Sequence, residues 1–125
     1  MKPGPILAAV IGLMFSLTAS QGAELSKLKV LYVGTPGTER ARQVVAFLQD
    51  KVAHVEAASR RGFDPREAAA FDVVMLDWPQ EGRQEQYWKE PAPLGDRQSW
   101  SKPTVLLGSA GLNLAVVWQV RGGAG

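Results

Sequence analysis

Apolar residues gather in four short runs along the chain, and each run has the length and composition of a β-strand. The first, third and fourth are rich in valine and leucine, side chains that suit extended backbone packed in a sheet. The third is apolar without alternation, which is typical of a strand buried on both faces of a parallel sheet. The predicted strands cover residues 28–33, 54–58, 71–77 and 103–107.

Between these runs the apolar positions follow a helical period. After Thr38, which is suited to cap a helix, apolar residues recur on one face of a 3.6-residue period. This stripe consists of Ala41, Val44, Val45, Leu48 and Val52. A shorter helix is predicted over residues 65–70, because Asp64, Pro65 and Glu67 match the residue preferences of a helix start.

The last apolar segment, residues 112–120, suits either a buried helix or another strand. We predict a helix, because parallel strands need a crossover after each strand and the Arg-Gly-Gly sequence at 121–123 is a suitable helix stop. Residues 78–102 are rich in proline, glycine and charge, and they predict a long loop of the kind that often carries function.

The alternation of strands and helices predicts an α/β domain with a mostly parallel sheet. Right-handed crossovers place the strands in the order 2-1-3-4, with helices on both faces. A doubly wound domain usually continues with one more strand and helix, so we expect the chain to be truncated at its C-terminus relative to a longer protein. In such a sheet, ligands bind beyond the carboxyl ends of the strands.

The first residues have the composition of an export signal. Lys2 supplies a positive charge, residues 6–17 form an uncharged apolar core, and small or polar residues follow as far as Ala23. The core is shorter than the roughly 20 residues that span a membrane, so we predict a cleaved signal peptide over residues 1–23 rather than an anchor. Residues 24–125 then form one domain, periplasmic or secreted, with no stable membrane span.

Composition narrows the possible chemistry. The chain has no cysteine and His54 is its single histidine, which excludes thiolate catalysis, cysteine-bound metals and a multi-histidine zinc site. Removal of the leader takes only Lys2 from the 14 basic residues, so 13 basic side chains face 12 acidic ones. This near-neutral balance indicates no nucleic-acid partner. We predict no cofactor and no bound metal.

Two turns at the predicted ligand-binding edge carry candidate chemistry. Gly34 and Thr35 begin like a phosphate-binding loop, but Glu39 follows where that loop requires glycine, so a turn leading into a capped helix is the simpler interpretation. Ser109 follows a buried strand on a tight turn, as a hydrolase nucleophile does, and Asp77 ends the neighbouring strand. The spacing is not G-x-S-x-G, and His54 is expected at the other end of its strand, so both are weak catalytic candidates.

The loop at 78–102 contains Trp78, Trp88 and Trp100 among many charged residues. Flat aromatic faces beside polar groups suit a sugar or a peptide, whereas the simpler interpretation is that tryptophans pin the loop to the sheet. Arg60 and Arg61, which follow the second predicted strand, are expected to lie in a solvated turn. The predicted ligand-binding residues are Gly34, Thr35, Asp77, Trp78, Trp88, Trp100 and Ser109.

Two stretches resemble a known family. Residues 71–77, FDVVMLD, and residues 102–115, KPTVLLGSAGLNLA, are similar to the trehalose-utilisation (ThuA-like) branch of the class I glutamine-amidotransferase-like fold and to exported bacterial proteins of that type. The resemblance implies a flavodoxin-like three-layer α/β/α fold whose binding edge faces the turn after the fourth strand. It implies no glutaminase activity, because the amidotransferase turn holds a cysteine and this chain has Ala110 nearby and no cysteine.

The sequence therefore favours a catalytically silent, exported ThuA-like domain that binds a small polar ligand, such as a carbohydrate, at the carboxyl edge of its sheet. Two alternatives stay open. One is a hydrolase that uses Ser109 with Asp77, and the other is an interaction module of a larger envelope protein. Neither the ligand nor the oligomeric state follows from the sequence.

Overall fold

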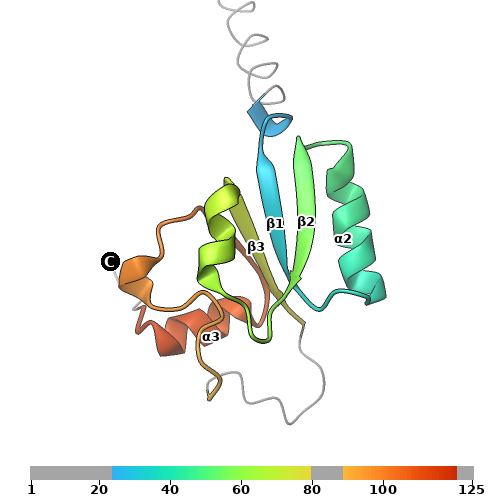
Figure 1. The fold of residues 1–125 in the computed structure, drawn as a ribbon. Helices are drawn as coiled ribbons and strands as arrows, with labels where there is room; N and C mark the ends of the chain where they lie inside the picture. The colour runs from blue at the N-terminus through green and yellow to red at the C-terminus, as the bar shows by residue number, and fades with distance from the viewer. Residues whose placement is uncertain (1–23, 80–88, 121–125) are drawn as a thin grey trace, which may run out of the picture.

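The computed structural model describes residues 24–79 and 89–120, and its centre is a parallel sheet of four strands in the order β2-β1-β3-β4 (Figure 1). This confirms the predicted α/β class and strand order. The predicted signal peptide, Trp88 and the predicted helix stop at residues 121–123 lie outside the described residues. The strands are β1 (Lys29–Gly34), β2 (His54–Ser59), β3 (Val73–Trp78) and β4 (Thr104–Gly108).

The helical segments are α2 (Glu39–Gln49), η1 (Pro65–Ala70), η2 (Arg97–Ser99) and α3 (Ala110–Val117). Three of the four lie where the sequence pattern places them, and the fourth, η2, is a short turn of helix within the predicted loop. The choice of a helix after the last strand is confirmed. Val52 lies beyond the end of α2, and its N–H still donates to the carbonyl of Leu48 across the turn that closes the helix. Asp64 caps η1 as predicted, since its carboxylate accepts from the Arg66 N–H.

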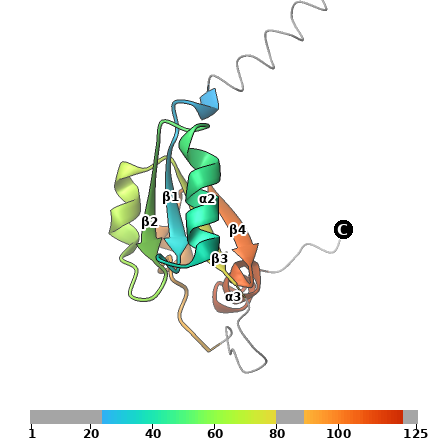
Figure 2. The same ribbon diagram turned by 90° about the vertical axis from the view of Figure 1, so that its right-hand side faces the viewer.

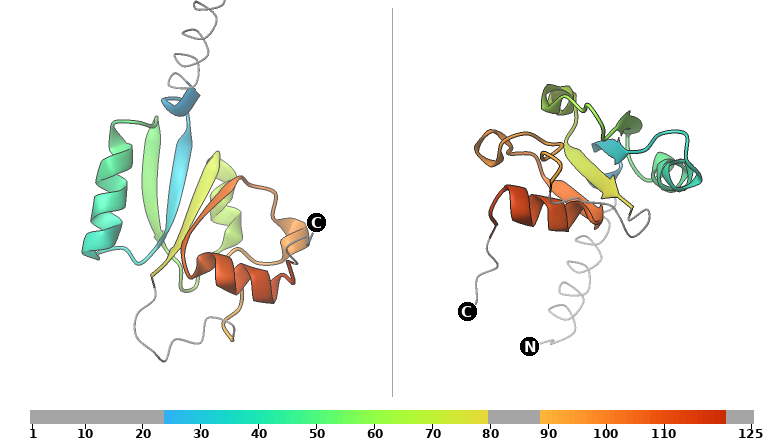
Figure 3. Two further views of the ribbon diagram at one scale, coloured as in Figure 1. Left: turned by 180° about the vertical axis from the view of Figure 1, so that it is seen from behind. Right: turned by 90° about the horizontal axis from the view of Figure 1, so that it is seen from below.

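Three layers result from this arrangement, with α2 on one face of the sheet and η1 and α3 on the other (Figures 2 and 3). Among the described residues no helix is long and apolar enough to cross a membrane. The main core lies between the sheet and the η1 and α3 layer. Its buried members are Leu31, Val33, Ala68, Phe71, Val74, Leu76, Trp78, Leu94, Ala110 and Leu114.

Strand alternation sends the other side chains of β1 and β3 towards the α2 face. Leu31 and Val33 belong to the main core, so Tyr32 points to the opposite face. The same argument applied to Leu76 and Trp78 places Asp77 on the α2 face. These two polar side chains therefore share one face of two neighbouring strands.

Register brings the carboxyl ends of the strands to one rim. Val33 is paired with Leu76, and Trp78 is paired with Gly108. The Ser109 N–H also donates to the Trp78 carbonyl at 2.7 Å. Gly34, Asp77 and Ser109 therefore lie along a single edge of the sheet, as the predicted topology requires.

Candidate functional site

A buried carboxylate lies at the rim, on the α2 face. Asp77 has no exposed surface. Its Oδ2 accepts from the Tyr32 hydroxyl at 2.5 Å and from Arg40 Nε at 2.7 Å, and its Oδ1 accepts from Arg40 Nη2 at 3.0 Å. Burial of a charge is costly unless the charge is paired and hydrogen-bonded, and this carboxylate has both kinds of partner. We call Tyr32, Arg40 and Asp77 the rim triad.

Gly34 makes room for the tyrosine of the rim triad. The phenol of Tyr32 lies along its own strand, and a Cβ atom added at Gly34 would lie 2.7 Å from the ring carbon Cε1 and from the hydroxyl oxygen. Contacts that short do not occur between unstrained atoms, so any side chain at this position forces the ring to move. Glycine at the end of β1 is therefore what lets the Tyr32 hydroxyl reach Asp77.

The tyrosine of the rim triad is held in its neutral form. Burial, and then the hydrogen bond to Asp77, raise the pKa of Tyr32 far above its ordinary value. A raised pKa in the folded state contributes stability that is complete below the ordinary tyrosine value of about 10 and is lost as the pH rises above it.

We therefore predict that the Tyr32→Phe variant has a flatter alkaline stability profile than the wild type. Above about pH 10 the free energy of unfolding of the wild type should fall by up to roughly 1.4 kcal/mol per pH unit more than that of the variant. The reason is that the wild-type protein releases the Tyr32 proton only when it is unfolded. Urea unfolding at several pH values measures this difference. Parallel profiles for the two proteins would contradict the assigned hydrogen bond.

Arg40 presents one edge of its guanidinium outward. Nε and Nη2 both bind Asp77, which raises the pKa of Arg40 further and keeps the group charged. The side chain is 49% exposed, and Nη1 donates no hydrogen bond to any residue that the structure describes. A buried carboxylate thus fixes the orientation of a cation whose remaining donors face solvent at the rim.

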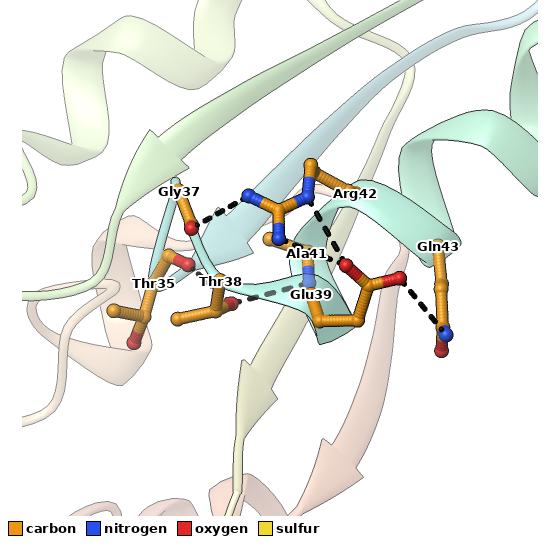
Figure 4. Close-up of polar contacts among 7 residues, drawn as sticks. All are labelled: Thr35, Gly37, Thr38, Glu39, Ala41, Arg42 and Gln43. Atoms are coloured by element: carbon orange, nitrogen blue, oxygen red, sulfur yellow. Dashed lines mark hydrogen bonds and ion pairs between the residues drawn. The ribbon is translucent and has the colours of Figure 1, made fainter.

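The start of α2 is a capped turn, as the sequence indicates (Figure 4). Thr38 Oγ1 accepts from the Ala41 N–H at 3.2 Å and donates to the Thr35 carbonyl at 2.7 Å. The carboxylate of Glu39 accepts from Arg42 Nη2 at 2.8 Å and from Gln43 Nε2 at 3.3 Å. Glu39 is therefore neutralised along the outside of the helix and does not engage Arg40.

A second charged cluster lies at the same rim on the opposite face. The ring of Trp78, which has no exposed surface, packs beneath the guanidinium of Arg60, with 3.7 Å between Arg60 Cζ and the ring centre. Arg60 Nη1 binds Glu90 Oε2 at 3.0 Å. The expectation of a solvated turn is wrong for Arg60, which is only 7% exposed, because the aromatic face and the carboxylate compensate its desolvation.

Of the three predicted tryptophans, the structure describes Trp78 and Trp100, and it does not bring these two together. Trp78 is covered by Arg60, and Trp100 lies at the amino end of β4, where its Nε1 donates to Thr104 Oγ1 at 2.8 Å. Trp100 also packs against the main core, so it pins the loop to the sheet at the edge opposite the rim. Beside Arg60 the loop does form a hollow of about 540 Å³, lined by Arg60, Arg61, Gly62, Phe63, Glu90, Pro91, Ala92 and Pro93.

Ser109 is the residue directly before α3, and it is buried. Its neighbour on the rim, Asp77, is engaged by Tyr32 and Arg40 and does not orient a base. His54 is the first residue of β2, at the amino end of the sheet, where its Nε2 lies 3.2 Å from Glu56 Oε1. The structure therefore brings Ser109 and Asp77 to one edge without the histidine that a serine nucleophile needs.

Sequence reasoning missed Tyr32 and Arg40. The available signal was Asp77 itself, because a carboxylate at the end of a buried strand needs a cation and hydrogen-bond donors nearby. Alternation along β1 and the first turn of the following helix point to these two residues. Within residues 24–79 and 89–120, no group of three or more histidine or acidic side chains is placed to hold a metal ion.

Comparisons with known protein families, with curated proteins and with solved structures find no match to this chain.

Proposed function

We propose that this chain is an exported, non-catalytic domain of the ThuA-like type that binds a small polar ligand at the carboxyl rim of its sheet. The observation that supports this function is the outward edge of Arg40. Its guanidinium is oriented by a buried carboxylate before any ligand arrives, so binding does not require the side chain to be ordered.

The chemistry of the rim defines the ligand. The exposed edge of Arg40 offers only hydrogen-bond donors and a positive charge, which suit the oxygens of a carboxylate or a phosphate. Arg40 also lies in the first turn of α2, where the partial positive charge of the helix favours an anion. A sugar acid or a sugar phosphate combines this group with the hydroxyls of a polar ligand. A neutral sugar lacks the matching charge.

Calorimetric titration tests this proposal with inorganic phosphate, gluconate and glucose as probes. We expect phosphate and gluconate to bind and glucose to bind at least about tenfold more weakly, because one charge-assisted hydrogen bond contributes about 1.5–3 kcal/mol. Arg40→Gln should weaken binding of both anions by about tenfold or more. Arg40→Lys, which keeps the charge but not the paired geometry, should have an intermediate affinity.

Two matched variants locate the site. Arg42→Gln removes a cation that already binds Glu39 and the Gly37 carbonyl, and Arg61→Gln removes one beside the hollow on the other face. Both should leave the anion affinity within about twofold of wild type. A loss of anion affinity in Arg61→Gln but not in Arg40→Gln would move the site to the hollow and contradict the assignment to the rim triad.

Export predicts a defined processed N-terminus. Expression of the full chain in a bacterium should yield protein outside the cytoplasm that begins at Glu24, directly after the predicted signal peptide, or one residue earlier at Ala23. N-terminal sequencing of the purified protein measures this. Protein that retains Met1 and stays in the cytoplasm would contradict the exported assignment without affecting the ligand site.

A further inference from the structure

A further hollow lies between η2 and the end of α3, which are neighbours in space (Figure 3). Its volume is about 640 Å³, within the range of sites that hold small ligands. The residues that line it belong to the loop before β4 and to the C-terminal end of α3. We call it the Trp118 pocket, and its lining includes Pro91, Asp96, Arg97, Val117 and Trp118.

The indole of Trp118 is fixed in place. Its Nε1 donates to the Gly95 carbonyl at 2.7 Å, and its ring packs against the main core. The Trp118 carbonyl accepts from Arg97 Nη1 at 3.4 Å, so the two walls of the pocket are joined by one hydrogen bond in each direction. Pro91 and Val117 add apolar surface beside the ring. An apolar group of a ligand therefore meets a preformed wall.

Two opposite charges border the pocket without neutralising each other. Asp96 and Arg97 are neighbours in sequence, but neither forms an ion pair within residues 24–79 and 89–120. Asp96 directly precedes η2, and its carboxylate does not bond the N–H groups of that turn. Arg97 donates through Nη1 to the Trp118 carbonyl, and its other side-chain donors bond no residue that the structure describes. A carboxylate and part of a guanidinium are therefore available to a ligand.

We propose that the Trp118 pocket binds a free α-amino acid with an apolar side chain. The ammonium group of the amino acid pairs with Asp96, its carboxylate pairs with Arg97, and its side chain packs on Trp118. A ligand with one charge fits less well, because Asp96 repels an anion and Arg97 repels a cation. A neutral sugar leaves both charges without a partner. The pocket is separate from the rim triad, none of whose residues lines it.

Nitrogen NMR of the tryptophan side chains tests this assignment on the full chain as its host cell processes it, with L-phenylalanine as the probe. The Trp118 indole N–H signal, identified by its loss in Trp118→Phe, should shift with a dissociation constant of about 1 mM, because few contacts hold so small a ligand. N-acetylphenylalanine lacks the ammonium charge, and phenylalanine methyl ester lacks the carboxylate charge. Each should bind about fivefold more weakly than phenylalanine, since each loses one exposed ion pair.

Asp96→Asn assigns the ammonium group to its partner. The substitution should weaken phenylalanine binding about fivefold and should not weaken N-acetylphenylalanine binding, because that ligand has no ammonium group to lose. Asp50→Asn is the matched control, since the side chain of Asp50 is 81% exposed at the end of α2 and Asp50 does not line the pocket. It should bind phenylalanine as the wild type does.

Three results would overturn the proposal. The first is a Trp118 signal that does not move at about 20 mM phenylalanine, a concentration well above the expected constant. The second is equal affinity for phenylalanine, its methyl ester and its N-acetyl derivative, which would mean that the pocket reads only the apolar side chain. The third is equal weakening by Asp96→Asn and Asp50→Asn. Shifts confined to the amides of Thr35 to Ala41 would place the amino acid at the rim and belong to the first result.

Discussion

Replacing Asp77 by alanine is expected to lower the free energy of unfolding by about 3 kcal/mol, because the change leaves the buried Tyr32 hydroxyl and the Arg40 guanidinium without their shared partner. The Tyr32 hydroxyl loses its acceptor in the protein interior, and Arg40 loses the carboxylate that fixes it. Arg40 is half-exposed and regains water, which keeps the loss at the lower end of the range for buried ion pairs. Urea unfolding measures it.

The matched experiment is a double-mutant cycle with Arg40. Arg40→Ala alone leaves a buried carboxylate without its cation and should cost about 2–3 kcal/mol. The double variant should cost at least about 1 kcal/mol less than the sum of the two single changes, because the two side chains bind each other directly. Additive losses would show that Arg40 and Asp77 do not interact in solution.

Gly108→Ala is expected to cost about 3 kcal/mol, because this residue combines a left-handed backbone with a close approach to another strand. Its φ angle is +65°, and an added Cβ would lie 2.3 Å from the Trp78 carbonyl oxygen. That oxygen also accepts from the Ser109 N–H, so relief of the clash would break the bond that positions Ser109 on the rim. Thermal and urea unfolding measure the loss.

Gly37→Ala separates the cost of the left-handed backbone from the cost of the clash with Trp78. Gly37 also has a positive φ, +86°, but an added Cβ would meet no atom within 4 Å. We expect it to cost about 1 kcal/mol, the ordinary penalty for a left-handed residue with a side chain. Equal losses at Gly37 and Gly108 would mean that the backbone at the end of β4 is not held against Trp78.

The sequence was sufficient for the sheet because its information is local. Three of the four strands, β1, β3 and β4, are largely apolar runs bounded by turn residues, and Thr38 and Asp64 mark helix starts by the side-chain oxygens that cap them. Right-handed crossovers then leave few possible orders. The position of Gly34, Asp77 and Ser109 along one rim follows from strand order alone, without any knowledge of side-chain contacts.

The contents of the site depended on contacts that a linear pattern does not encode. Trp78 ends a strand at the rim, but alternation turns its ring into the core beneath Arg60. Trp78 and Trp100 were both predicted in the long loop, but Trp78 is the last residue of β3, and Trp100 lies where the loop returns to the amino end of β4. The cover that Arg60 forms over Trp78 and the position of Trp100 both depend on contacts between distant parts of the chain, and spacing along the chain carries no record of them.

Nitrogen NMR of the arginine side chain reports whether Arg40, fixed by Asp77, binds an oxyanion at the rim. The Arg40 Nε–H should give a resolved, slowly exchanging signal, because it donates to a buried carboxylate. On addition of inorganic phosphate or gluconate, that signal and the amides of Thr35 to Ala41 should shift together with a single affinity. Shifts confined to the hollow beside Arg61, or an unchanged Arg40 signal at saturation, would contradict oxyanion binding at Arg40.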